Sequence, residues 1–245
     1  MRISSFTLCL LLITSSGCTA LGPRSVVSHS SGNGPETKLL RQVNDDVRAD
    51  ACKTTGIELA RKGQTEHAVH QLEQARHYAP QMKGVAHPLA VLYDQQGLYS
   101  KAELEYRKAL KEAPRDASLL SDYGYFLYER GELKEAEAHL RQAIKRSPSH
   151  QKASVNLGMV LAEQQRYEEA LITFKDVVGE AAAHHNLAVI RYRHGGASEA
   201  RKHFETAAKL DPGLQPPRML LSYLDDRENT SVQHVNHEVD EVPSR

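Results

Sequence analysis

Tryptophan is absent from this 245-residue chain, and aromatic residues make up only 6% of it. A large aromatic core is therefore excluded, and an architecture that buries thin layers of small apolar side chains is favoured. An excess of charge is lacking too, because 31 Lys and Arg residues are balanced by 31 Asp and Glu residues. Nucleic-acid binders normally carry a basic excess, so this balance argues against that class of protein.

Cysteine is scarce, with three residues at Cys9, Cys18 and Cys52. Cys9 lies in an apolar N-terminal run that is expected to be removed, and Cys18 follows that run. Cys52 would then stand alone, so no intrachain disulfide is predicted. We interpret Cys52 as a small, partly buried packing residue, and the alternative is a reactive thiol.

The sequence also lacks the short motifs of common catalytic and metal sites. It has no Gly-rich phosphate loop, no His-Glu-x-x-His helix and no paired-cysteine zinc pattern. The chain has 13 histidines, but pairs such as His67 and His70 or His184 and His185 have no evident third ligand. We therefore predict no catalytic residue, metal or cofactor. Some carboxylates are interpreted as a solvated surface: Glu103, Glu105, Glu135 and Glu137.

The most informative feature that the sequence does contain is a repeat of 34 residues. Pro80, Pro114 and Pro148 are spaced at this interval, and Pro212 follows after one interval of 34 and one shortened to about 30. Two further sets keep the same register: Gly63, Gly97, Gly131 and Gly195, and Ala68, Ala102, Ala136, Ala170 and Ala200. A 34-residue period with small residues and a terminal proline is typical of stacked helical hairpins.

Large and small residues alternate within each repeat as in the tetratricopeptide repeat (TPR) family, which the chain resembles over about 165 residues. Pairs on the expected first helices are Thr55-Gly56, Leu89-Ala90, Tyr123-Gly124, Leu157-Gly158 and Leu187-Ala188. The resemblance implies an all-α, right-handed superhelical solenoid of about five helix-turn-helix repeats with N- and C-terminal capping helices. Gln165 replaces the turn glycine of the fourth repeat, so that turn is predicted to be less ideal.

The domain boundaries follow from this register. The repeats are predicted at 49–82, 83–116, 117–150, 151–180 (a short repeat, with Gly179 ending its second helix) and 181–214. A capping helix is expected at 37–48, from the helical spacing of Leu39, Leu40, Val43 and Val47, and another at 215–226. Residues 18–36 are interpreted as a flexible tether and residues 227–245 as a disordered tail.

The N-terminus is predicted to be a signal and an anchor. Arg2, a short apolar stretch at 6–13 and small residues before Cys18 form a secretory signal at 1–17, too short to span a membrane. The small-small-Cys ending resembles bacterial lipoprotein signals, and ordinary secretion is the alternative. The resemblance implies that Cys18 is lipidated, and Thr19 after it implies outer-membrane sorting toward the periplasm.

The resemblance also predicts where a partner binds, because one face of each first helix lines an inner groove in this family. The corresponding residues are Ile57, Val91, Tyr125, Tyr128, Met159, Val189 and Tyr192. This apolar, tyrosine-bearing surface suits a peptide or helical segment of a protein partner. The alternative is that these side chains only pack between neighbouring helices.

Residues 121–136 narrow the family resemblance. This segment, SDYGYFLYERGELKEA, is similar to one in pilotin-type lipoproteins of type IV pilus biogenesis, and Flp-type pilus lipoproteins are a related possibility. The main hypothesis is therefore a non-enzymatic, lipid-anchored scaffold of the bacterial envelope that assists pilus or secretin assembly. A generic periplasmic adaptor for cell-wall or secretion machinery is the second hypothesis, and an unrecognised enzyme that uses histidines is the third.

Overall fold

The computed structural model describes residues 35–215, 217 and 219–223. The predicted signal peptide with Cys18, the tether up to residue 34 and the predicted tail lie outside these residues. Contacts divide the chain into two units, Met1–Gln42 and Val43–Arg245. The first is represented by the start of one helix, and the second contains all the packing described below.

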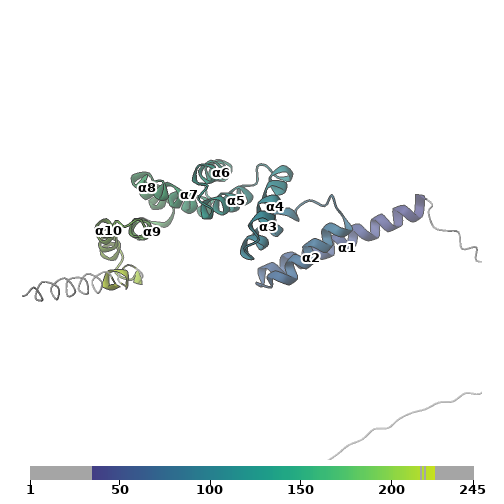
Figure 1. Cartoon of the computed structure of the whole chain (residues 1–245), viewed down its shortest axis with the longest axis horizontal. Helices are drawn as coiled ribbons and strands as arrows, with labels where there is room; N and C mark the ends of the chain where they lie inside the picture. Colours follow the sequence, from purple (N-terminus) through teal and green to yellow (C-terminus); the bar gives the residue numbers. More distant parts are fainter. Residues whose placement is uncertain (1–34, 216, 218, 224–245) are drawn as a thin grey trace, which may run out of the picture. The chain divides into compact units, whose positions relative to one another are not determined.

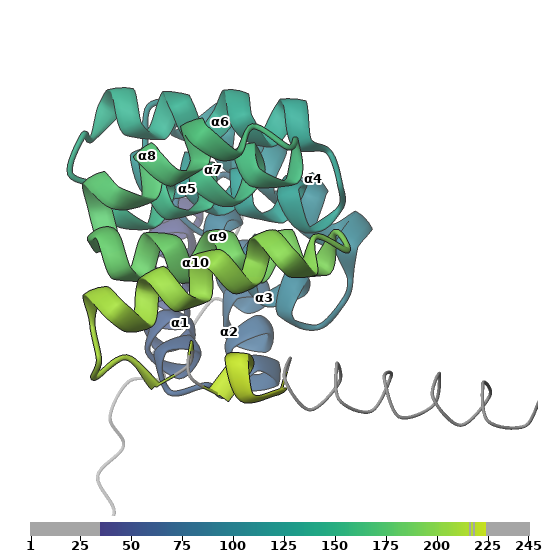
Figure 2. The same cartoon turned by 90° about the vertical axis from the view of Figure 1, so that its left-hand side faces the viewer.

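The described residues form successive helical hairpins without a strand, which confirms the all-α prediction of about five repeats (Figure 1). The helices are α1 (Pro35–Arg61), α2 (Thr65–Tyr78), α3 (Ala86–Gln95), α4 (Tyr99–Glu112), α5 (Ala117–Glu129), α6 (Leu133–Arg146), α7 (Gln151–Glu163), α8 (Tyr167–Val178), α9 (Glu180–Arg193) and α10 (Ala197–Leu210). Each first helix from α3 to α9 contacts the second helix of its own hairpin, and α3, α5 and α7 also contact the first helix of the next. Figure 2 shows this arrangement for the last hairpin, where α9 and α10 run side by side next to α7 and α8.

The turn inside each hairpin requires a residue with positive φ. Gly131 provides it in the third repeat, with φ of 76°, and glycine occupies the same place in the other repeats except the fourth. There Gln165 adopts φ of 63°, the one non-glycine residue with positive φ in the described part of the chain. A side chain is sterically disfavoured in this region, so the prediction of a less ideal turn agrees with the backbone.

The second helices end in two ways. Four of them stop two residues before a proline, whose ring excludes helical backbone in the residue that precedes it. These helices end at Tyr78, Glu112, Arg146 and Leu210. In the short fourth repeat α8 lacks this proline, and Gly179, with φ of 84°, alone separates Val178 from the start of α9.

Close helix approach explains the small residues of the first helices. A Cβ atom added at Gly158 would lie 2.5 Å from a ring carbon of Phe174, and one at Gly124 would lie 2.7 Å from Cγ of Leu140. The resulting core is continuous from α2 to α9. The last hairpin has a separate small cluster of Ala188, Ala200 and Phe204, against which the helical residues Leu220 and Leu221 pack.

The N-terminal cap differs from its prediction. Residues 37–48 do not form a separate helix, because α1 runs without a break from Pro35 to Arg61. The apolar residues expected to cover the first repeat are between 53% and 69% exposed: Leu39, Leu40, Val43 and Val47. Since α1 has 27 residues and α2 only 14, α2 cannot cover α1 over its whole length.

One carboxylate was misassigned to the surface. Glu105 on α4 is only 4% exposed. Its two carboxylate oxygens accept hydrogen bonds of 2.8 and 2.5 Å from the guanidinium of Arg76 on α2, and Lys108 donates a further one of 2.8 Å. This bidentate pair joins the first and second repeats. Cys52, in contrast, is half-buried against the core, as its sequence interpretation requires.

Candidate functional site

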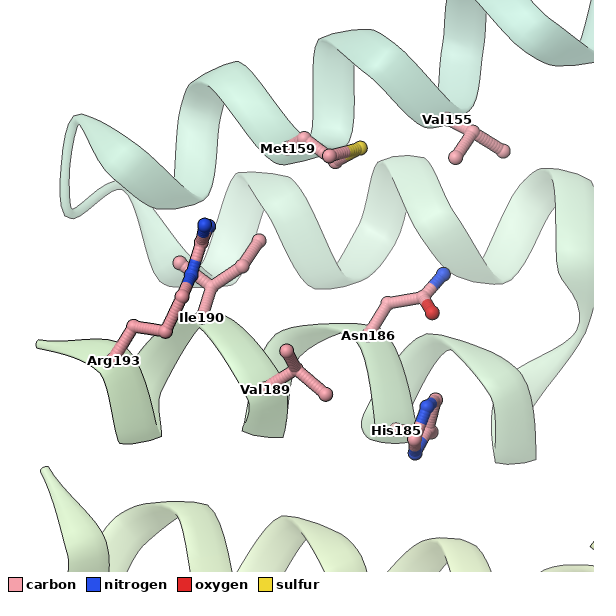
Figure 3. A pocket seen from close by; sticks show the side chains of 7 residues that line it. All are labelled: Val155, Met159, His185, Asn186, Val189, Ile190 and Arg193. Carbon is pink, nitrogen blue, oxygen red and sulfur yellow. The ribbon is translucent and has the colours of Figure 1, made fainter. Parts of the chain in front are cut away.

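A hollow of about 310 Å³ lies between the neighbouring first helices α7 and α9 (Figure 3). Its walls are mainly aliphatic in the middle and polar toward its ends. The lining residues are Val155 and Met159 on α7, and His185, Asn186, Val189, Ile190 and Arg193 on α9. A concave, largely apolar site with a few polar groups is the usual form of a binding site.

Helical spacing brings these residues to one surface. Val155 and Met159 are four residues apart on α7, and Val189 and Arg193 are four apart on α9. Residues at this spacing project from the same face of a helix. Because α7 contacts α9, the two faces enclose a common space.

The charged end of the hollow is organised around Glu163 at the end of α7. Arg193 donates a hydrogen bond to one carboxylate oxygen of Glu163, and Nε2 of His194 lies 2.6 Å from the other. The hydroxyl of Tyr128 donates to Glu163 over 3.3 Å and accepts from Arg193 over 3.3 Å. Residues from α5, α7 and α9 are thus joined by one carboxylate. Burial raises the pKa of Tyr128, so this hydroxyl stays protonated at neutral pH.

A second polar junction links α3, α5 and α7. Oδ1 of Asp122 accepts a hydrogen bond of 2.7 Å from Lys152, and its Oδ2 lies 2.9 Å from Nε2 of His87. Burial alone would raise the pKa of Asp122, but the hydrogen bonds from His87 and Lys152 outweigh it and lower that pKa. These contacts hold successive first helices together.

The predicted groove residues fall into two groups in the structure. Met159 and Val189 line the same hollow. Ile57, Val91 and Tyr125 are half-buried against the large core, and Tyr192 is half-buried against the cluster of the last hairpin. Tyr128 is only 8% exposed, and its ring lies 5.9 Å from that of Tyr125. The contacts of Tyr128 therefore give it a packing and hydrogen-bonding role within the repeats.

Sequence reasoning missed five residues that line the hollow: Val155, His185, Asn186, Ile190 and Arg193. The signal that could have identified most of them is their spacing from predicted residues. Val155 precedes Met159 by four positions, while Asn186 and Arg193 lie three before and four after Val189. One or two residues per repeat were too narrow a choice, because a helix presents a face rather than a single position.

The described residues show neither a metal-binding cluster nor a membrane-spanning helix. No group of three or more His, Cys, Asp or Glu side chains in this part of the chain is placed to hold a metal ion. His184 instead faces His203, with their Nδ1 atoms 2.8 Å apart. Of the helices described, none has the length and apolar character that crossing a membrane requires.

Comparison with protein families gives two matches to repeat models. The tetratricopeptide repeat model matches residues 54–117. The model of the cilia and flagella-associated protein 70 middle TPR-like domain matches residues 87–186. Together the two matches cover most of the hairpins described above.

A curated relative gives a more specific likeness. The chain is 29% identical to the type IV pilus assembly protein PilF of Pseudomonas aeruginosa over 130 residues, which are 53% of this chain. The match spans 47% of PilF, so the chain aligns with about half of that protein's length.

Solved structures agree with this likeness. The structure of Pseudomonas aeruginosa PilF superposes with a TM-score of 0.56 and 25% identity, and covers 82% of this chain and 95% of its own. YrrB, described as a TPR protein with an unusual peptide-binding site, gives a TM-score of 0.58 at 20% identity and covers 76% of this chain and 97% of its own, which shows the shared fold alone. The chain is accordingly a tetratricopeptide repeat protein that resembles pilotin-type proteins of type IV pilus assembly.

Proposed function

We propose that this protein is a non-enzymatic interaction scaffold, lipid-anchored in the bacterial envelope, that binds a segment of a partner protein along its first helices. Its proposed role is to assist assembly of a type IV or Flp pilus or of a secretin. Stacked helical repeats offer extended surfaces for protein partners, and this supports a binding rather than a catalytic role.

The observation that carries the proposal is the match to PilF over 130 residues. It covers more than half of this chain, and the solved PilF structure aligns with 82% of it. The name of PilF connects that protein with type IV pilus assembly. We transfer this role to the present chain as the proposed function.

The anchoring part of the proposal rests on the sequence. An apolar, signal-like stretch precedes Cys18, and the small residues before this cysteine resemble a lipoprotein signal. Several acyl chains on Cys18 would anchor the protein firmly, because a single acyl chain binds a membrane only marginally. Both segments lie outside the residues that the structure describes.

The binding surface is proposed to centre on the hollow between α7 and α9. Met159 and Val189 line it, and both are half-buried, so each retains apolar area for a partner. Burial of that area in a complex would contribute roughly 25 cal/mol per Å² before the costs of association are subtracted.

An affinity pull-down from detergent-solubilised envelope tests the proposal. The full-length protein is compared with the double variant Met159→Ser, Val189→Ser, and both are checked for the same helical content. We expect the wild-type protein to recover a pilus or secretin component and the double variant to lose it. The matched control is Ile172→Ser, at a 61% exposed aliphatic residue on α8 that is not part of the hollow.

Two outcomes would contradict the proposal at different points. Equal recovery of the pilus component by the double variant would remove the hollow as the binding surface. Recovery of cell-wall enzymes in place of pilus or secretin components would favour a generic envelope adaptor over a pilus-assembly role.

A further inference from the structure

We propose that His184 on α9 and His203 on α10 bind one divalent transition-metal ion reversibly, and that the bound ion joins the two helices of the last hairpin. This inference is independent of the proposed function, because it concerns the stability of the hairpin and not its partner. The approach of the two imidazoles, their accessibility and the small core of this hairpin support it.

The two imidazoles face each other through atoms that can bind a metal. The Nδ1 atoms of His184 and His203 lie 2.8 Å apart, and the ring centres lie 5.1 Å apart. Zinc binds imidazole nitrogen at about 2.0–2.1 Å in a tetrahedral arrangement, which places two such ligands about 3.3 Å from each other. The pair therefore needs to open only from 2.8 Å to about this distance to hold an ion between the rings.

Neutral imidazole chemistry permits this exchange of a hydrogen bond for a metal. Without an ion, a hydrogen bond between the two Nδ1 atoms requires one of them to carry a proton and the other to accept it. A neutral imidazole can carry its proton on either nitrogen, so transfer of that proton to Nε2 of the same ring leaves both Nδ1 lone pairs free. Neutral imidazole is the commonest metal ligand in proteins and suits zinc, copper and nickel.

The pair lies at the edge of the core, where a dissolved ion can reach it. His184 and His203 are half-buried, whereas their chain neighbours Ala183 and Phe204 are buried. Two histidines are fewer than the side chains of a closed structural metal site, so water completes the coordination of the ion. Binding is therefore expected to be weaker than in a four-ligand site and reversible.

Charged groups around the pair act on a cation in both directions. The carboxylate of Glu180, four residues before His184 on α9, interacts with His184 and would attract the ion. Lys175 on α8 donates a hydrogen bond of 2.6 Å to this carboxylate and acts on His184 with the opposite sign. Arg191 acts in the same way on His203. Removal of the charge of Lys175 should therefore strengthen metal binding.

The last hairpin has a small core of its own that a bound ion would reinforce. Its buried cluster contains only Ala188, Ala200 and Phe204. A ligand that binds the folded form and not the unfolded form stabilises the folded form by mass action. An ion held between α9 and α10 would thus keep closed the hairpin that also supplies one wall of the hollow.

The sequence indicates a different pair of histidines from the one that the structure brings together. His184 and His185 are adjacent in the chain, but consecutive residues of a helix do not face each other. His185 lines the hollow, and its ring lies 5.8 Å from that of Phe204. The partner of His184 lies 19 residues away on the next helix, a separation that no helical spacing indicates.

Amide hydrogen exchange during a titration with Zn²⁺ tests the inference on the full-length protein, which carries no affinity tag and is first stripped of metal by a chelator. Once free Zn²⁺ reaches about ten times the dissociation constant, binding should slow the exchange of α9 and α10 about tenfold. The exchange of α3 and α4 should not change, because the proposed site joins only the helices of the last hairpin.

Four variants, each checked for wild-type helical content, separate a bridging ion from one that binds elsewhere. His184→Gln and His203→Gln, tested singly, should each abolish the slowing, because an ion held by one ring cannot join two helices. Lys175→Gln should lower the Zn²⁺ concentration at half-maximal slowing. The matched control is the double variant His67→Gln, His70→Gln on α2, which removes two exposed histidines and should leave the response of α9 and α10 unchanged.

Three contrary results would overturn the inference. One is unchanged exchange of α9 and α10 up to millimolar Zn²⁺. Another is slowing that persists in His184→Gln or in His203→Gln, which would show that the two rings do not share an ion. The third is equal slowing in all hairpins, which would assign the stabilisation to metal bound elsewhere on the chain. None of these results bears on the proposed function, which the pull-down tests separately.

Discussion

Gln165 holds the turn of the fourth hairpin in a conformation that favours glycine. Its φ is 63°, whereas Gly131 and Gly195 have φ of 76° and 81° at the same place in their repeats. In this region the Cβ atom crowds the backbone, which costs roughly 1–2 kcal/mol per residue. Glycine avoids this cost but loses more conformational entropy on folding.

We therefore predict that Gln165→Gly raises the free energy of unfolding by about 0.5–1 kcal/mol, since relief of the strain exceeds the entropic loss. Chemical denaturation measures this change. The converse substitution Gly131→Gln should destabilise the protein by a similar amount. A loss of stability in Gln165→Gly would mean that the Gln165 side chain contributes more than its backbone costs.

At the residue scale, the features that could be predicted from the sequence are those that depend on the local backbone conformation. The turn at Gln165 could be predicted because the other repeats supply the expected glycine. The burial of Glu105 could not, because it depends on Arg76, which lies 29 residues away in the preceding repeat. The burial of Tyr128 could not be predicted either, because its contacts with Glu163 and Arg193 come from two later helices.

The contact between α2 and α4 includes a partly buried ion pair of Arg76 and Glu105 with a defined pH dependence. Burial alone would raise the pKa of Glu105, but hydrogen bonds from Arg76 and Lys108 outweigh this effect and lower it below its ordinary value of 4.5. A carboxylate with a lowered pKa in the folded state stabilises the fold above its unfolded pKa. That stabilisation is lost as the pH falls through the folded value.

We predict that Glu105→Gln lowers the free energy of unfolding by about 1.5–3 kcal/mol at neutral pH. The difference between wild type and variant should shrink as the pH falls below about 4.5, because Glu105 then binds a proton in the unfolded chain that it binds in the folded protein only at lower pH. Denaturant titrations at a series of pH values measure both effects. The control Glu103→Gln removes an exposed pair with Arg107 and should change stability by less than about 0.5 kcal/mol.

A difference between wild type and Glu105→Gln that stays constant down to pH 3 would contradict the ionic origin of this contribution. It would indicate that shape and burial at Glu105, rather than its charge, join α2 to α4.

At the element scale the repeats could be predicted because the same turn, packing and helix-stopping residues recur with each period. The hairpin turns, the prolines after second helices and the short fourth repeat follow from that register alone. The N-terminal helix was not predictable in the same way, because it has no counterpart in the repeat. The spacing of Val43 and Val47 correctly indicated a helix, but apolar periodicity does not say whether another element covers that face.

Stability is distributed unevenly through the repeats. One buried core continues from α2 to α9, while the buried cluster between α9 and α10 contains only Ala188, Ala200 and Phe204. In repeat proteins each hairpin is stabilised by its own contacts and by its neighbours, so a terminal hairpin with a small core opens first. The hollow between α7 and α9 lies beside this hairpin.

Four histidines stand in this last hairpin, and three of them are half-buried: His184, His185 and His203. His184 and His203 face each other through their Nδ1 atoms, and the ring of His185 lies 5.8 Å from that of Phe204. Burial lowers the pKa of all three. Lys175 on α8 lowers the pKa of His184 further and Arg191 lowers that of His203, while Glu180 acts in the opposite direction on His184.

The unfolded chain therefore binds more protons than the folded hairpin once the pH falls below about 6.5, and the stability of the hairpin decreases there. We predict that amide exchange in α9 and α10, corrected for intrinsic rates, is faster at pH 5.5 than at pH 7.5 while α3 and α4 change less. The double variant His184→Gln, His203→Gln should weaken this dependence, and His67→Gln on α2 should leave it unchanged. A uniform acceleration across all hairpins would assign the effect to global unfolding and contradict a locally weakened end.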